Sequence, residues 1–275
     1  MDAVSKKHVM KIPGLILLLA AAAQASVIYS SIPSPLPPNV PSLGYEATSS
    51  AEFGGLIQFA GVDRLLTSAT IVISEWAPES EYEAVGTSTG FDLPMTLKLY
   101  DVGPGNTVGA LIGSAQVTAT IQWRPEADPT CTSGVWRASN GTCYNGFAQT
   151  VTFTLPNLLV PDAVIYGLAF DTQHHGYQPT GIAGPVNSTN FGLSSASPSV
   201  GSNPLPGTAY WNTSYAGFYA DGGAAGVGVF RQDTNWTPYS GAITFDASSP
   251  TPEPATTASL LTGLVLLGLK ARKRR

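Results

Sequence analysis

Four glutamates lie within nine residues of this sequence: Glu75, Glu79, Glu81 and Glu83. Two such carboxylates could serve as acid and base in glycoside hydrolysis, provided they are held about 5 Å or about 6.5 to 9.5 Å apart across a cleft. Glu79, Glu81 and Glu83 could instead bind calcium, which prefers oxygen ligands. The spacing of these residues in the sequence establishes neither a catalytic pair nor a calcium site. The sequence favours a solvated acidic loop, with calcium binding and catalysis as alternatives.

A second polar group follows the apolar residues 164–170 and contains Asp171, His174 and His175. Imidazole and carboxylate groups can bind metals or transfer protons. Adjacent side chains on an extended backbone point to opposite faces, so His174 and His175 are poorly placed to share one metal ion. We expect an ordinary loop here. No phosphate-binding glycine loop occurs either, and no catalytic residue and no cofactor is predicted.

Aromatic residues gather in the C-terminal third of the sequence. Five of them form a candidate glycan-binding face: Tyr210, Trp211, Tyr215, Tyr219 and Trp236. Sugar rings stack on aromatic faces, while neighbouring amides and carboxylates bond to the sugar hydroxyls. Alternating aromatics in a β-protein more often fill its core, and that interpretation is the favoured one.

The sequence contains two cysteines, Cys131 and Cys143, in a segment rich in Thr, Ser, Gly and Asn. In an oxidising compartment this pair is predicted to form a disulfide that closes a long loop, worth about 3 kcal/mol in the chain-entropy model. A redox pair or a metal site would need closer spacing or a nearby histidine. The pair therefore indicates an exported protein.

The elements that position these side chains are predicted to be strands. Met95, Leu97 and Leu99 alternate with polar residues, which is the period of a half-buried strand. Other strands are expected at 53–59, 66–74, 116–123, 151–155, 163–171, 191–194, 209–215 and 241–246. No amphipathic helical pattern separates them. We therefore expect an all-β fold consisting of a single β-sandwich, of which a jelly roll would be one form.

The N-terminal segment has the organisation of a signal peptide. Three lysines precede the apolar residues 12–23, and Ala23 and Ala25 are the small residues that signal peptidase reads. We expect residues 1–25 to be removed by cleavage before Ser26.

The C-terminal segment combines Pro252, Glu253 and Pro254, 12 residues from Ala258 to Leu269 that are mainly apolar, and a basic end at 270–275. This order resembles the PEP-CTERM sorting signal of exopolysaccharide-producing Gram-negative bacteria. In that family the membrane protease exosortase recognises the tripeptide and is thought to remove the tail. A permanent membrane helix needs about 20 apolar residues, so the resemblance implies a short hydrophobic sorting helix that is held only transiently in the inner membrane.

Three regions lie between the two terminal signals. Residues 26–45 contain five prolines, all between residues 30 and 42, and are predicted to form an extended arm. Residues 46–246 are assigned to the β-sandwich, 247–251 to a linker, and 252–275 to the sorting signal.

The net charge of the central part restricts the classes of partner that it can bind. Residues 26–251 contain sixteen acidic and five basic residues, a formal net charge of −11. Nucleic acid is excluded as a partner because phosphate binding needs clustered Lys and Arg. Neutral glycans, divalent cations and cationic surfaces remain.

The sequence therefore predicts an exported protein of the extracellular space or cell surface, processed by signal peptidase and exosortase. Its expected role in an exopolysaccharide matrix is non-catalytic: structural, adhesive or glycan-binding. The alternative is a secreted carbohydrate-active hydrolase on the same scaffold, with its acid and base among the four glutamates.

Overall fold

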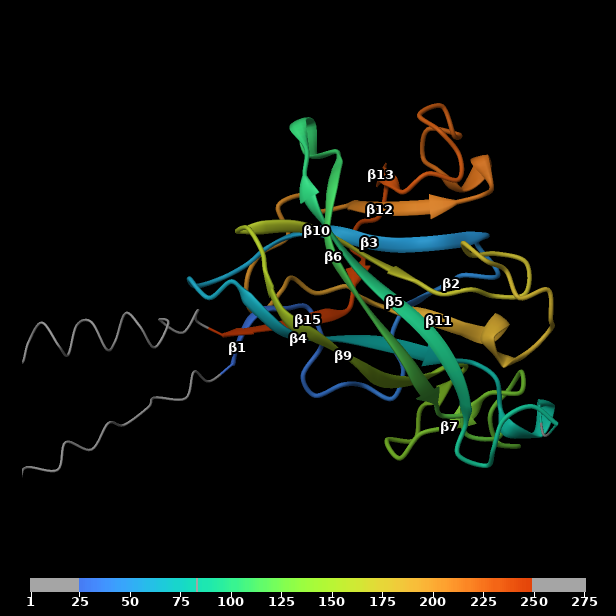
Figure 1. Cartoon of the computed structure of the whole chain (residues 1–275). Coiled ribbons are helices and arrows are strands. Elements are labelled where there is room, and N and C mark those ends of the chain that lie inside the picture. The colour runs from blue at the N-terminus through green and yellow to red at the C-terminus, as the bar shows by residue number, and fades with distance from the viewer. Residues whose placement is uncertain (1–24, 83, 249–275) are drawn as a thin grey trace, which may run out of the picture.

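The computed structural model describes residues 25–82 and 84–248, which form two large β-sheets and a short hairpin (Figure 1). Every pair of named strands is antiparallel, and these residues contain no α-helix. The predicted all-β class is confirmed, and the two sheets are consistent with a β-sandwich. Residues 1–24 and the sorting signal with Pro252, Glu253 and Pro254 lie outside the described residues.

The first sheet is built around the central strand β4 (Leu65–Glu75). Its strands are β1 (Ser26–Ser30), β15 (Ile243–Ser248), β4, β11 (Thr189–Ser194) and β14 (Ser240–Gly241), with β2 (Ser42–Gly44) paired to β11 and β9 (Phe147–Leu159) paired to β4.

The second sheet has six strands, in the order β13 (Arg231–Thr234), β12 (Thr208–Thr213), β3 (Ser50–Gln58), β10 (Ala163–Ala169), β5 (Phe91–Val102) and β6 (Val108–Ile121). The hairpin pairs β7 (Trp136–Arg137) with β8 (Cys143–Tyr144). Four 3-10 turns complete the elements: η1 (Glu79–Glu81), η2 (Pro104–Asn106), η3 (Pro185–Ser188) and η4 (Ala216–Phe218).

Alternation at period two explains how the sheets meet. In β5, Met95, Leu97 and Leu99 are buried while the residues between them are more exposed. Phe153 of β9 and Phe245 of β15 belong to the same buried cluster but come from the first sheet. The apolar faces of both sheets therefore pack against each other in one core.

The proline-rich segment is part of the fold, so the prediction of an extended arm over residues 26–45 is wrong. Strand β1 pairs with β15, and Val40 packs on Val72 of β4 in a second apolar cluster. Proline cannot donate a backbone hydrogen bond but can accept one. The carbonyls of Pro38 and Pro41 accept from the amides of Ala148 and Leu193, at 2.9 and 2.6 Å. The segment thus covers the outer face of the first sheet.

The C-terminal boundary also differs from the expectation. Ala247 is fully buried within β15, which continues to Ser248, so the first two residues of the predicted linker belong to the sheet. Residues 249–251 lie outside the described part of the chain. Ser26 and Ala247 face each other across the β1–β15 ladder, which places the two ends of the described chain at one edge of the first sheet (Figure 1).

The outer face of the second sheet has an apolar cluster of its own. Leu56, Ile165 and Tyr210 are buried there, and Tyr100 and Phe230 pack against them. The three buried residues lie on the neighbouring strands β3, β10 and β12, on the face opposite the main core. The sheet therefore buries apolar side chains on both sides, and only part of its outer face is open to solvent.

Candidate functional site

The predicted aromatic face is largely internal. Tyr210 and Trp211 are buried because β12 is covered on both faces, and Tyr219, which follows η4, is buried as well. Trp211 donates a 2.7 Å hydrogen bond to the Ser50 hydroxyl, and the hydroxyl of Tyr219 accepts from the Thr213 amide at 3.1 Å. A sugar-binding face made of all five rings is therefore wrong.

The remaining two of the five predicted rings differ in exposure. Trp236 is partly buried, packs edge-on against Trp211 and donates to Asp233 at 2.8 Å. Tyr215 is 59% exposed and contacts Phe218. Only Tyr215 presents most of its ring to solvent, and its binding role stays a prediction.

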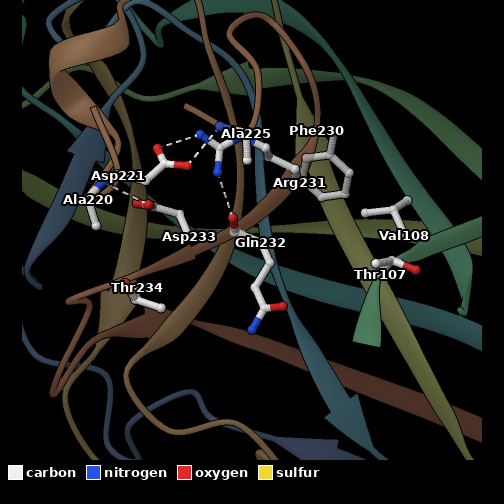
Figure 2. A pocket seen from close by; sticks show the side chains of 10 residues that line it. All are labelled: Thr107, Val108, Ala220, Asp221, Ala225, Phe230, Arg231, Gln232, Asp233 and Thr234. Carbon is white, nitrogen blue, oxygen red and sulfur yellow. Dashed lines mark hydrogen bonds and ion pairs between the residues drawn. The ribbon is translucent and has the colours of Figure 1, made fainter. Parts of the chain in front are cut away.

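A cavity of about 550 Å³ lies between β13, the start of β6 and the loop that follows η4 (Figure 2). Its charged groups are already engaged. Arg231 donates to Asp221 at 2.8 Å and to the Gln232 carbonyl at 3.0 Å, and its guanidinium lies 3.8 Å from the centre of the Tyr219 ring. The hydrogen bond from Arg231 lowers the pKa of Asp221. These contacts hold the loop that follows η4 against the edge strand β13. The role of the cavity's charged groups is therefore structural.

The described glutamates of the acidic segment lie in different surroundings. Glu75 is fully buried, accepting from the Ala77 amide at 2.8 Å and from the Thr189 hydroxyl at 2.7 Å, so it cannot reach a substrate. Glu79 and Glu81 lie in η1. Within residues 25–82 and 84–248, no three His, Cys, Asp or Glu side chains are grouped to hold a metal ion. Since Glu83 lies outside the described residues, calcium binding there stays a prediction.

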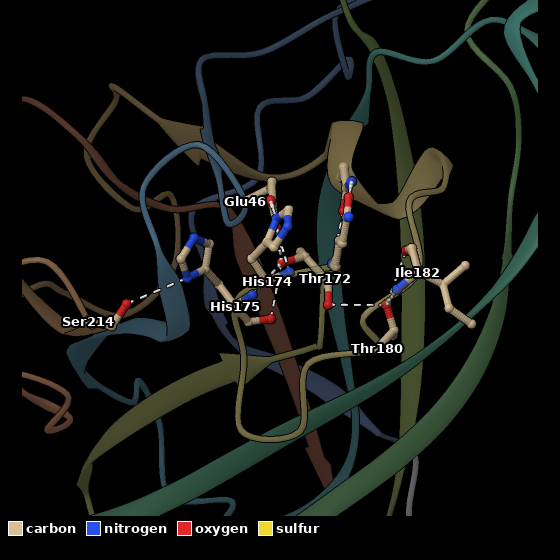
Figure 3. A network of polar contacts seen from close by, with 9 residues as sticks. Glu46, Thr172, His174, His175, Thr180, Ile182 and Ser214 are labelled. Atoms are coloured by element: carbon tan, nitrogen blue, oxygen red, sulfur yellow. Dashed lines mark hydrogen bonds and ion pairs between the residues drawn. The ribbon is translucent and has the colours of Figure 1, made fainter.

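The predicted histidine loop is held by a polar network (Figure 3). His174 and the Thr172 hydroxyl both bond to Glu46, whereas His175 lies 3.5 Å from the Ser214 hydroxyl. The two imidazoles therefore have different partners, as expected for adjacent residues. Partial burial would raise the pKa of Glu46, but the hydrogen bonds from Thr172 and His174 outweigh it and lower that pKa. The network anchors the loop after β10 to the turn before β3.

This anchored loop carries Tyr177 over the outer face of the second sheet. The Tyr177 hydroxyl donates to the carboxylate of Glu52 at 2.5 Å, and Lys98 donates to the same oxygen at 2.8 Å. Tyr100 donates to the other oxygen of Glu52 at 2.9 Å. Glu52 is fully buried, and its charge is balanced by that of Lys98. A Cβ atom on Gly167 would lie 2.1 Å from the carboxylate, so only glycine leaves room for it.

Tyr177 forms one wall of an open groove of about 550 Å³. One side of its ring meets the Lys98 ammonium, 3.9 Å from the ring centre, yet the residue is 50% exposed. Strands β5, β6 and β10 and the anchored loop supply the lining: Pro94, Met95, Thr96, Lys98, Ser114, Gln116, Val117, Thr118, Ala169, Phe170, Asp171, Tyr177 and Gln178.

The groove presents polar groups that the rest of the fold does not use. Thr96 of β5 lies opposite Gln116 of β6, and neither side chain bonds to another described residue. The Gln178 side chain is likewise free of partners within the described chain. Its backbone N–H donates to the Asp171 carboxylate at 2.9 Å. A half-exposed aromatic ring beside unpaired amides and hydroxyls is the chemistry that recognises a neutral polyhydroxylated ligand.

Cys131 and Cys143 form the predicted disulfide, with their Cα atoms 6.0 Å apart. It closes the loop that contains β7 and β8. A disulfide is typical of proteins that reside in an oxidising, extracytoplasmic compartment.

The chain matches no protein-family model, no curated protein and no solved structure. No helix within residues 25–82 and 84–248 has the length and apolar character to cross a membrane.

Proposed function

We propose that this protein is exported, processed at both ends by signal peptidase and exosortase, and binds polysaccharide in an extracellular matrix without cleaving it. The groove beside Tyr177 is the proposed binding site. Apart from Asp171 and Lys98, which is paired with the buried Glu52, the lining is uncharged. Together with the acidic exterior of the body, this lining favours an uncharged sugar polymer over an anionic one.

The observation that carries this proposal is the fixed position of Tyr177 beside unpaired polar side chains. Glu52 holds the tyrosine hydroxyl, and the Glu46 network holds the base of its loop. A ring held in place before binding loses little conformational entropy when a sugar stacks on it. Neighbouring residues on one face of a strand lie roughly 7 Å apart, which suits contacts with successive hydroxyls of one sugar unit.

Export rests on separate support. The resemblance of residues 252–275 to a PEP-CTERM signal, the signal-peptide pattern of residues 1–25 and the disulfide all favour the same route. A transient stay in the inner membrane follows from the short apolar stretch of the tail.

The groove proposal is tested by affinity electrophoresis of the full chain through gels that contain dextran, xylan or galactomannan. We expect at least one of these neutral polymers to retard the protein. Replacement Tyr177→Ala should reduce the affinity for that polymer by about tenfold, the loss typical of a central aromatic contact, and so reduce the retardation.

Tyr239→Ala is the matched control, because it removes another exposed tyrosine that lies outside the groove. It should leave retardation unchanged. Equal retardation of the wild type and Tyr177→Ala in every gel would contradict the proposed site. Release of reducing sugar by the wild type would instead support the hydrolase.

A further inference from the structure

The outer face of the second sheet has two hollows of equal volume, about 550 Å³ each. The groove is lined by β5, β6 and β10 together with Tyr177. The cavity of Figure 2 is lined by the edge strand β13, together with Phe230 and with Val108 at the start of β6. The pairing register of the strands places the two hollows relative to each other.

One row of paired residues crosses the sheet from the groove to the cavity. Lys98 lines the groove and pairs with Gly167, which pairs in turn with Gly54. Gly54 also pairs with Tyr210, and Tyr210 pairs with Gln232, which lines the cavity. Residues that lie opposite each other in antiparallel strands point to the same face of the sheet. Lys98 and Gln232 are therefore on one face and are separated by four strand spacings, about 19 Å.

Three aromatic side chains connect the two hollows across this face. Tyr177 lines the groove and Phe230 lines the cavity. Tyr100 of β5 shares the Glu52 carboxylate with Tyr177, and its ring centre lies 5.4 Å from that of Phe230. All three aromatic residues keep part of their surface exposed. Aromatic rings in series can stack on successive units of one sugar chain.

The cavity also presents uncharged polar groups that the fold does not use. The side-chain amide of Gln232 and the hydroxyl of Thr234 line it without bonding to another described residue (Figure 2). Its charged groups Arg231 and Asp221 bond to each other at 2.8 Å, so their charges are balanced. An aromatic ring beside a free amide and a free hydroxyl repeats the chemistry of the groove.

We propose that the cavity is a second subsite for the neutral polysaccharide, so that one polymer chain lies across the outer face from Tyr177 to Phe230. This inference rests on the proposed function. One sugar unit is roughly as long as one strand spacing, about 4.8 Å, so a chain of about five units is needed to reach both hollows. A shorter ligand can occupy one hollow only, whereas a longer one gains the contacts of both. Affinity should therefore rise with chain length until both hollows are filled.

Calorimetric titration of the full chain with oligosaccharides tests the second subsite. The ligands are isomalto-, xylo- and manno-oligosaccharides of three and of six units, which represent the chains of the three polymers named above. We expect at least one six-unit ligand to bind at least about tenfold more tightly than its three-unit counterpart. The double replacement Gln232→Ala with Thr234→Ala should abolish most of this difference. It should leave the affinity for three units unchanged, because the groove holds them, and that binding also shows that the variant is folded.

Gln58→Ala with Thr154→Ala is the matched control, because it removes the same side-chain types from two exposed strand positions outside both hollows. It should keep the tenfold difference. Equal affinity for three and six units in every series, or an unchanged difference in the Gln232 and Thr234 variant, would overturn the second subsite. Loss of three-unit binding in Tyr177→Ala would then still support the groove, whereas absence of binding to every ligand would contradict the groove as well.

Discussion

Glu75 shows how one residue can look catalytic in a sequence and be structural in the fold. It ends strand β4 and binds the backbone at Ala77 and the hydroxyl of Thr189. Burial raises the pKa of this carboxyl to about 7, even though both hydrogen bonds act to lower it. A carboxyl with such a pKa is suited to acid catalysis only where a substrate can reach it, and here none can.

The raised pKa makes stability depend on pH. The native state holds a proton on Glu75 more tightly than the unfolded chain, so stability should fall as pH rises from about 4.5 to about 7, by up to about 3 kcal/mol. Glu75→Gln should remove this slope. Urea unfolding at pH 5, 6, 7 and 8 measures it.

Glu46→Gln is the control, because the contribution of Glu46 to stability depends on pH in the opposite direction. The pKa of Glu46 is lowered, so its contribution is present above the unfolded value near 4.5 and is lost as pH falls through the folded one. Its removal should reduce stability at neutral pH. A pH slope that is identical in wild type and Glu75→Gln would contradict the role assigned to Glu75.

Single residues also mark the limit of the sequence-based site prediction. Glu52 is the one charged residue of β3, and a charge at a buried strand position could have indicated a polar network. Tyr177 gave no such signal, because its role depends on a loop that brings it to Glu52, 125 residues away in sequence. The cluster at 210–219 was conspicuous in sequence but mostly serves the core.

Among the elements, long alternating strands were predictable and short ones were not. β5 and β15 alternate along most of their length, and β9 does so over residues 151–155. β2, β7, β8 and β14 have two or three residues each, too few for any period to be visible. The proline-rich segment escaped prediction for another reason: its contribution lies in carbonyl acceptors and a few apolar contacts, which composition does not reveal.

The disulfide should matter most to the hairpin element that it encloses. Replacing Cys131 and Cys143 together with serine frees a loop whose closure is worth about 3 kcal/mol, and we expect the melting temperature to fall by roughly 6 to 12 °C. Thermal unfolding followed by circular dichroism measures this. Treatment of the wild type with a reductant is the control and should reproduce the shift.

Trp136 limits how far the loss of the disulfide destabilises the neighbouring sheet. Its indole donates to the Gly146 carbonyl at 2.8 Å and packs against Phe147 at the start of β9. Proteolysis of the double variant should therefore begin within residues 128–143. An unchanged melting temperature would show that the loop is ordered without its covalent link.

At the scale of the whole molecule, the proposed processing has a direct readout in the intact mass of the secreted protein. We expect a product that begins at Ser26 and lacks the residues after the Pro252 region. Glu253→Ala should leave the tail attached, because it alters the recognised tripeptide, whereas Thr256→Ala just beyond it should not. A secreted wild-type protein with an intact tail would contradict the sorting proposal.

The pairing of β1 with β15 also sets the order in which this protein can complete its fold. Ser26 and Ala247 are 221 residues apart in sequence, yet they lie opposite each other in one ladder. A ribosome releases the N-terminal end first, so β1 lacks its ladder partner β15 until nearly the whole body has emerged. Contacts of such high sequence separation form slowly. The first strand to be made is therefore among the last to be secured, and the growing chain must stay soluble in the meantime.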